Sequence, residues 1–440
     1  MTPVARIQCA AESHACQSCK KQFRRARRVH LQPSRFPFVS RGAAVQVADF
    51  IAIRVHGLHA SLKSELAQHR KSGKVQPFVM TAVQSFCNDS PGGSLFLAIC
   101  RGCSPPLASD PETMTEAWQL AGQHGLEPLV AGYILDHPEA GWPTALQNEA
   151  RKTRDFALVR NIQLLALLGD IGRTLDGAGI PWIALKGPVF TAQYVGDLSR
   201  RTSSDLDVLV HPGDVPQVDR LFRSMQITSR RPAQPQKHPL GIRGHEHKYY
   251  STAPRYLVEL HWDLVWRSCY EIVSPGALFQ RAGTFQTESG SFPVLSPEDA
   301  LLYAAVHAFE HCWDHFHQLK TLDWILMGRP GWGQESLDWN FMLKTAAQAG
   351  KSRIFLLGLK LTRDLLHRQL PALVDDRIDS DPVLASLASQ VGRNFHGAGP
   401  ARSLPRAVLF KWQAMETWSD RLSMAFATVA ARLGWLRPPN

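Results

Sequence analysis

The spacing of hydrophobic residues divides the chain into three regions. From residue 80 to residue 179, apolar side chains recur every three or four positions, which is the period of an amphipathic helix. Between residues 180 and 295, apolar and polar residues alternate, and this period of two is typical of strands. From residue 296 the helical period returns. The pattern predicts an α+β chain in which a small sheet domain at 180–295 lies between helical domains at 80–179 and 296–440.

The predicted elements of the sheet region are strands, a hairpin and one helix. The strands lie at 182–186, 205–211, 247–252 and 255–261, the hairpin at 284–288 and 291–295, and the helix at 215–226. The stretch 229–246 is rich in Arg, Pro and Gly and is interpreted as an exposed loop. We extend this interpretation to His245-Glu246-His247, as an exposed polar loop.

Helices are predicted on both sides of the sheet region. The N-terminal ones lie near 96–100, 113–125, 126–135 and 143–175, and the C-terminal ones at 297–327, 335–349, 352–369, 382–396 and 404–433. The helix at 143–175 carries an apolar stripe, which we expect to lie in the core. The members of this stripe are Leu158, Ile162, Leu165, Leu168 and Ile171.

The net charge of +11 is confined to the N-terminal part of the chain. Residues 1–79 contain 14 Lys and Arg against 3 Asp and Glu, and residues 80–440 contain 35 of each sign. The region after residue 79 therefore has no global basic surface that would attract a nucleic acid, and any such binding would have to be local.

The basic residues 1–79 lack the apolar stretch of a secretory signal. We expect them to be disordered, or to be absent from a working protein that begins at Met80, where the helical pattern starts. Cys16 and Cys19 form a single C-x-x-C pair, which is weak evidence for zinc without a second pair.

The five cysteines after residue 79 have no framework spacing, and their number is odd; they are Cys87, Cys100, Cys103, Cys269 and Cys312. Isolated thiols of this kind are typical of a reducing compartment, which predicts a cytoplasmic protein. Every long apolar run is interrupted by charges before it reaches the length of a membrane span, so we expect no membrane partner.

Two acids at alternate positions mark the candidate centre of chemistry. They are Asp205 and Asp207 in the segment DLDVLV at 205–210. Side chains two residues apart on a strand share a face, so both carboxylates point the same way while Leu206 and Val208 enter the core. Neighbouring like charges are unfavourable unless a cation lies between them, and Mg2+ prefers carboxylates and substrate phosphates.

The motifs around these acids resemble a known fold. They are LKG at 185–187, Tyr194, R-x-x-S-D at 201–205, DLDVLV at 205–210 and VELHW at 258–262. The stretch resembles the nucleotidyltransferase fold of the DNA polymerase beta superfamily, and more narrowly a bacterial family of uncharacterised nucleotidyltransferases. The resemblance covers roughly residues 95–330. It implies a small mixed sheet and transfer of a nucleoside monophosphate from an NTP, and it identifies no acceptor.

Nucleotidyl transfer by this superfamily uses two metal ions, expected here to be Mg2+ with Mn2+ as an alternative. Such chemistry requires a third carboxylate near Asp205 and Asp207. Glu259 is the candidate, because it alternates with Val258 and Leu260 on the next predicted strand. The predicted metal ligands and catalytic residues are therefore Asp205, Asp207 and Glu259.

The predicted nucleotide-binding residues are Lys186, Gly187, Arg201 and Ser204. A glycine turn before a helix presents backbone N–H groups to phosphates. Members of the wider superfamily have Gly-Gly or Gly-Ser there, so the Lys186 ammonium would replace part of those contacts. Arg201 would lie at the rim of the phosphate site, while Arg200 matches no motif and is expected to be solvated.

Several histidines lie near the predicted site. His261 follows Glu259 and is expected to orient a metal ligand or a base. His307, Glu310 and His311 form the H-x-x-E-H string of some zinc hydrolases, and His307 and His311 would share one helical face. The family resemblance instead implies a His-rich helix packed on the catalytic domain, with His311 on the acceptor side.

Three functional hypotheses follow. The first is an Mg2+-dependent nucleotidyltransferase that acts on an unknown acceptor, which is a small molecule, a sugar, a protein or RNA. The second is a catalytically inactive scaffold of the same fold that binds a nucleotide or a protein. The third is a zinc hydrolase that uses His307, Glu310 and His311. The presence of all three acids favours the first.

Overall fold

The computed structural model describes residues 90–103, 110–231, 233, 245–252, 254–265, 270–328, 337–395, 401 and 403–424. The chain divides into two units, 1–76 and 77–440, and every described residue belongs to the second. The predictions for residues 1–79, including the Cys16 and Cys19 pair, lie outside the described residues. Among the helices described, none has both the length and the apolar character needed to cross a membrane.

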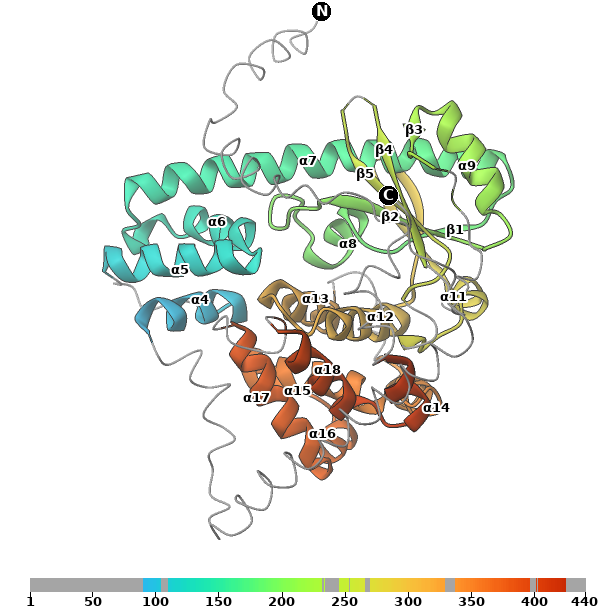
Figure 1. Cartoon of the computed structure of the whole chain (residues 1–440). Helices are drawn as coiled ribbons and strands as arrows, with labels where there is room; N and C mark the ends of the chain where they lie inside the picture. Colours follow the sequence, from blue (N-terminus) through green and yellow to red (C-terminus); the bar gives the residue numbers. More distant parts are fainter. Residues whose placement is uncertain are drawn as a thin grey trace, which may run out of the picture. The chain divides into compact units, whose positions relative to one another are not determined.

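Seven strands form one mixed sheet in the order β3-β4-β5-β2-β1-β7-β6 (Figure 1). β2 is parallel to β5 and β1 is parallel to β7, whereas the other neighbouring pairs are antiparallel. The predicted α+β class is thus confirmed. The strands are β1 (Trp182–Ala184), β2 (Asp205–Val210), β3 (Ile227–Thr228), β4 (Glu246–Ser251), β5 (Leu257–His261), β6 (Gly283–Thr287) and β7 (Gly290–Val294).

Helices precede, interrupt and follow the strands along the chain. Those before the sheet are α4 (Pro91–Arg101), α5 (Pro111–His124), α6 (Glu127–Asp136), the short η2 (Pro138–Ala140) and α7 (Thr144–Gly177). Those between strands are α8 (Pro188–Phe190), the π-helical η3 (Thr191–Val195), α9 (Val215–Ser224) and α11 (Pro275–Arg281). Those after the sheet are α12 (Pro297–Glu310), α13 (Phe316–Met327), α14 (Trp339–Gln348), α15 (Ser352–Leu366), α16 (Ala372–Ser380), α17 (Pro382–Phe395) and α18 (Leu404–Ala414).

The predicted helix at 297–327 is wrong as a single element. The structure has α12 and α13 separated by a turn in which Cys312 and Trp313 have positive φ angles of 57° and 54°. Trp313 is fully buried there, so tertiary packing of a large aromatic side chain overrides the helical period. The helix predicted at 404–433 is interrupted after Ala414, and residues 418–424 are helical again. β3, α11 and α16 were not predicted.

Both faces of the sheet are covered, and each face belongs to a different hydrophobic core. Leu206, Val208 and Val210 pack with residues of α7 and α9. The alternate residue Leu209 packs with residues of α12, α13 and the N-terminal helices on the other face. In Figure 1, α7 runs along one side of the strands and α12 and α13 lie on the other. The face of β2 that carries Asp205 and Asp207 is therefore the face turned to α12 and α13.

The expected core stripe of α7 is only partly buried. Leu165, Leu168 and Ile171 lie in the core beneath the sheet. Leu158 and Ile162, by contrast, are 36% and 51% exposed, so the prediction that they are core residues is wrong. Leu146 and Ala150 near the start of α7 belong to the core that contains α6, whereas Leu164 to Leu175 belong to the core that contains β2 and β7. α7 therefore extends beyond the sheet (Figure 1).

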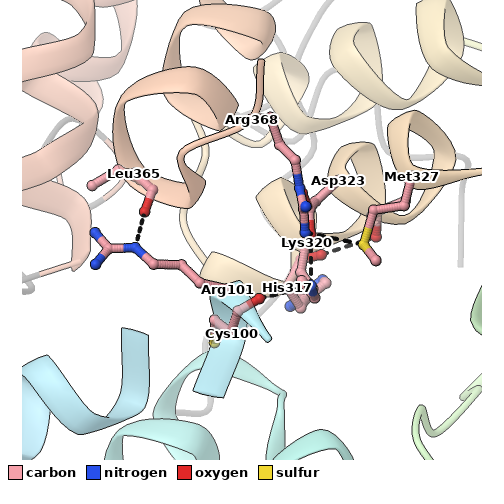
Figure 2. Close-up of polar contacts among 9 residues, drawn as sticks. Cys100, Arg101, His317, Lys320, Asp323, Met327, Leu365 and Arg368 are labelled. Carbon is pink, nitrogen blue, oxygen red and sulfur yellow. Dashed lines mark hydrogen bonds and ion pairs between the residues drawn. The ribbon is translucent and has the colours of Figure 1, made fainter. Parts of the chain in front are cut away.

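A buried ionic network joins the N-terminal and C-terminal helices (Figure 2). The Nζ atom of Lys320 on α13 donates to Asp323, at 2.6 Å, and to the carbonyl of Cys100 on α4, at 2.7 Å. Arg368, which follows α15, also binds Asp323. Next to Cys100, Arg101 donates to the carbonyl of Leu365 at 2.9 Å. The helices on both sides of the sheet region thus share one core, while the division at residues 179 and 295 stays a prediction.

Candidate active site

The predicted acids meet on one face of adjacent strands. β2 and β5 are parallel, and their register places Asp207 directly beside Glu259. Asp205 lies two residues earlier on β2 and therefore shares that face. β4 pairs with the other edge of β5 and brings Glu246 opposite His261 and Lys248 opposite Glu259. The sheet thus gathers carboxylates from β2, β4 and β5.

Asp207 is the most deeply buried of these acids, with 5% of its surface exposed. Nε2 of His261 lies 3.0 Å from its Oδ1. Burial alone would raise the pKa of Asp207, but Lys186, His261 and Arg201 outweigh burial and lower the pKa to about 2. Asp207 is therefore ionised at any physiological pH. The same contact raises the pKa of His261 against the opposing effect of its burial.

Asp205 and Glu259 are perturbed in the opposite direction. Burial and the neighbouring charge of Asp207 raise the pKa of Asp205. Burial, followed by the charges of Glu246 and Asp207, raises the pKa of Glu259. The charged form of each carboxylate is thus repelled by neighbouring carboxylates: Asp205 by Asp207, and Glu259 by Glu246 and Asp207. This donor set fits a divalent cation, because such an ion would remove the repulsion that raises both pKa values.

The interpretation of His245-Glu246-His247 as an exposed loop is wrong. Glu246 and His247 begin β4, and Oε2 of Glu246 lies 3.8 Å from Nε2 of His261. Lys248, two residues on, forms an ion pair of 2.7 Å with Oε1 of Glu259. Sequence reasoning missed Glu246 and Lys248, although their alternation in EHKYYS was the available signal for a strand with one polar face.

The Lys186-Gly187 turn follows β1 and ends next to Asp205. Gly187 has a φ of 77° and a ψ of −148°, a conformation that is essentially restricted to glycine. A Cβ atom at this position would lie 3.1 Å from the carbonyl oxygen of Asp205. The turn thus passes the β2 acids at a distance that only glycine permits. The Nζ atom of Lys186 lies 4.8 Å from the centre of the Tyr303 ring on α12.

Arg201 is held against this turn instead of being solvated. Its guanidinium donates to the carbonyl of Gly187, at 3.4 Å, and to Oγ1 of Thr191, at 3.2 Å. Arg200, expected to be solvated, binds Asp136 on α6 and lies 3.4 Å from Asp197. Ser204 is exposed at the end of the loop. Arg201 therefore fixes the turn, and Arg200 ties the loop to the N-terminal helices.

Two residues of α7 hold the loop that precedes Asp205, and neither was predicted. Arg160 donates to the carbonyls of Ser203, at 2.6 Å, and Ser204, at 2.7 Å. The buried amide of Asn161 donates to the carbonyls of Leu198 and Arg201 at 2.6 and 2.5 Å. α7 is thus a rigid support for the loop. No local sequence signal links residues this far apart in the chain.

Polar residues of α12 lie over the sheet face that carries the acids. Burial raises the pKa of Tyr303 well above its usual value, and the charges of Asp207 and Glu246 add to this effect. Burial likewise lowers the pKa of His307, with Lys186 as the next contributor, and raises that of Glu310 to about 7. His311 follows the last residue of α12 and is exposed.

The H-x-x-E-H string does not form a metal cluster in the part of the chain that is described. The rings of His307 and His311 lie 4.8 Å apart, centre to centre. Two groups of His, Asp and Glu side chains bring their ligand atoms within 4.8 Å of one another, and neither contains His307, Glu310 or His311. These groups are Asp207 with Glu259 and His261, and His245 with Glu246 and His261.

A cavity of about 840 Å³ opens beside the acids. Asp205, Lys186 and Gly187 form part of its wall. The rest of the wall comes from α5, α6, α7, α13 and the loop at 200–204, and includes Trp118, Phe156 and Trp324. Asp207 and Glu259 do not line the cavity, so a ligand there would reach the acids past Asp205.

We expect the Asp205→Asn variant to be more stable than the wild-type protein in the absence of divalent metal. A carboxyl whose pKa is raised on folding destabilises the folded state at pH values above that pKa, and asparagine removes this charge. The thermal unfolding midpoint in EDTA should rise by a few degrees. In Mg2+ the wild-type midpoint should rise and the variant's should not. A lower midpoint of the variant in EDTA would show that Asp205 is not held under repulsion.

A mixed sheet with acids on parallel neighbouring strands, after a glycine turn, defines a protein of the nucleotidyltransferase class. The model of the family described as "Uncharacterised nucleotidyltransferase" matches residues 110–367, and the chain belongs to this family. No curated protein matches the chain. Among solved structures, an antigenic nucleotidyltransferase-like protein from Paracoccidioides brasiliensis is 16% identical, with a TM-score of 0.28, over 50% of this chain and 97% of that one.

Proposed function

We propose that the protein transfers a nucleoside monophosphate from an NTP to an acceptor in an Mg2+-dependent reaction. The observation that carries this proposal is the convergence of Asp205, Asp207 and Glu259 on one sheet face beside the Gly187 turn. Carboxylates in this arrangement are the ligands that Mg2+ prefers. Membership of the nucleotidyltransferase family supports the same reaction class.

The residues of the chain have separable roles in this proposal. Asp205, Asp207 and Glu259 would hold the metal, which supplies activation of the attacking hydroxyl and neutralisation of the leaving pyrophosphate. The Gly187 turn would present backbone N–H groups to phosphates close to Asp205, and Lys186 adds positive charge there. Arg201, together with Arg160, keeps the turn and the loop in place. His261 orients Asp207 through its hydrogen bond.

The cavity is the proposed place for the nucleotide base or the acceptor. Its aromatic residues Trp118, Phe156 and Trp324 offer apolar surface, and Lys152 and Lys186 offer positive charge. Such a wall suits a ligand that combines an apolar or planar part with phosphates.

A titration tests the proposal. The four NTPs are titrated into the protein with and without Mg2+, and the Asp205→Asn/Asp207→Asn double variant is treated in the same way. We expect binding that depends on Mg2+ and disappears in the double variant, because the metal bridges the acids and the phosphates. Binding that ignores both the metal and the substitutions would contradict the proposed site.

One observation favours an inactive scaffold as the second candidate. Glu259 is paired with Lys248 at 2.7 Å and Asp207 with His261 at 3.0 Å, so protein cations already neutralise part of the acidic cluster. A scaffold would bind a nucleotide without releasing pyrophosphate. The release of pyrophosphate from a bound NTP in the presence of an acceptor pool therefore separates the two candidates.

A further inference from the structure

A second group of metal-ligand side chains lies at one end of the β4–β5 pair. His245 precedes β4, Glu246 is its first residue, and His261 is the last residue of β5. Glu246 and His261 are direct partners across the two strands. The carbonyl of His245 accepts hydrogen bonds from the backbone N–H of Trp262, at 2.9 Å, and of Asp263, at 3.3 Å. Backbone pairing thus fixes all three residues.

The three side chains converge on a small volume. Oε2 of Glu246 lies 3.5 Å from Nε2 of His245 and 3.8 Å from Nε2 of His261. Ligand atoms at about 2.0–2.1 Å from a tetrahedral zinc ion are roughly 3.3 Å apart, so small side-chain adjustments would complete such a site. The side chains of His245, Glu246 and His261 are 15%, 25% and 3% exposed. His261 is therefore shielded from competing water, whereas His245 and Glu246 are partly exposed.

Glu246 divides its two carboxylate oxygens between Lys248 and the histidines. The other carboxylate oxygen of Glu246, Oε1, faces Lys248 at 3.6 Å, while Oε2 faces the two histidines. In the metal-free protein, Nε2 of His261 donates its proton to the ionised Asp207, and metal binding would release this proton and leave the imidazole protonated at Nδ1. Nδ1 is buried and has no hydrogen-bond partner among the described residues. Nε2 currently lies 3.0 Å from Asp207, and a bound ion would compete with this contact.

We propose that His245, Glu246 and His261 form a binding site for a transition-metal ion such as Zn2+, separate from the Asp205, Asp207 and Glu259 cluster. Two imidazoles with one carboxylate are a borderline-soft donor set, which prefers Zn2+ or Co2+ to Mg2+. Three protein ligands leave one coordination position open for water or a ligand. The site lies next to the catalytic acids and shares His261 with their hydrogen-bond network. This inference needs no nucleotide and stands apart from the transfer reaction.

Metal titration of the full chain tests this site. Chelator-treated protein is titrated with Zn2+ by calorimetry and with Co2+ by absorbance, without nucleotide. We expect one ion per chain in the wild type, and an affinity at least about tenfold lower in His245→Ala and in Glu246→Gln. His247→Ala is the matched control, because Nε2 of His247 instead contacts Ser229, at 3.0 Å, and the carbonyl of Arg231, at 2.9 Å.

A further variant distinguishes the proposed zinc site from the cluster of catalytic acids. Glu259→Gln should keep the Zn2+ affinity, since Glu259 belongs only to the other group, with Asp207 and His261. Loss of Zn2+ binding in Glu259→Gln, or normal binding in both His245→Ala and Glu246→Gln, would place the ion outside the proposed site and overturn the proposal. Absence of Zn2+ and Co2+ binding in the wild type would also overturn it. Failure of NTP binding, with Zn2+ binding intact, would contradict only the proposed function and not the zinc site.

Discussion

Replacing Asp207 with asparagine should lower nucleotide transfer by about 10³-fold, because loss of a metal ligand removes several kcal/mol of charge stabilisation and each 1.36 kcal/mol is a factor of ten. Asp207 is buried, ionised, and placed beside Glu259 by the β2–β5 register. The asparagine side chain has nearly the same size as that of aspartate but carries no negative charge. The measurement is pyrophosphate release and transfer of α-labelled NTP to an acceptor pool, with the wild type assayed in parallel.

Asp219→Asn is the matched control for this variant. Asp219 is also buried, and it accepts a hydrogen bond of 2.8 Å from Tyr249 on the opposite face of the sheet. We expect this control to lose some stability through its contacts with Tyr249 and Arg223, and to keep transfer activity. Equal transfer by the wild type and Asp207→Asn would show that the β2 acids do not serve the reaction.

The Gly187→Ala variant should be impaired in both stability and NTP binding. An alanine at a φ of 77° and a ψ of −148° is strained by about 1–3 kcal/mol. Its Cβ would also lie 3.1 Å from the carbonyl oxygen of Asp205, so the turn or β2 must shift. We expect a lower free energy of unfolding in denaturant titrations. NTP affinity should fall at least about tenfold, because a small displacement of a positioning element is costly.

Gly141→Ala is the control that separates the effect of backbone strain from the effect of the close contact between Gly187 and Asp205. Gly141 has a φ of 73°, yet no atom lies within 4 Å of the position of its Cβ. It ends the short helix η2, away from the acids. This control should lose stability and keep NTP affinity. If Gly187→Ala also retained its NTP affinity, the turn would not be part of the nucleotide site.

The fold class followed from local patterns, because alternation and helical spacing are properties of neighbouring residues. DLDVLV and LVELH each carry alternate apolar residues, and both are strands whose acids share a face. The break between α12 and α13 could not be predicted from the spacing of neighbouring residues. It depends on Trp313, which is buried by the packing of helices that are distant in the sequence. Local pattern therefore predicted one helix where packing makes two.

Only the residues of the candidate site that lie within sequence motifs could be predicted. Asp205, Asp207, Glu259 and the Gly187 turn lie within the segments that resemble the family. The contributions of Glu246, Arg160 and Asn161 come from strand pairing and from α7, and so they depend on contacts across long stretches of chain. Arg201 was predicted to lie at the phosphate rim, and its contacts with Gly187 and Thr191 add a role in fixing the turn that the motif did not indicate.

The most direct test is a crystal structure of the protein with Mn2+ and a non-hydrolysable analogue of the NTP that binds best. Mn2+ takes the oxygen ligands of Mg2+ and gives an anomalous signal that locates the ion. The central claim predicts anomalous density between Asp205, Asp207, Glu259 and the triphosphate, with the phosphates against the Gly187 turn. A nucleotide bound elsewhere, with no ion at these three acids, would contradict it.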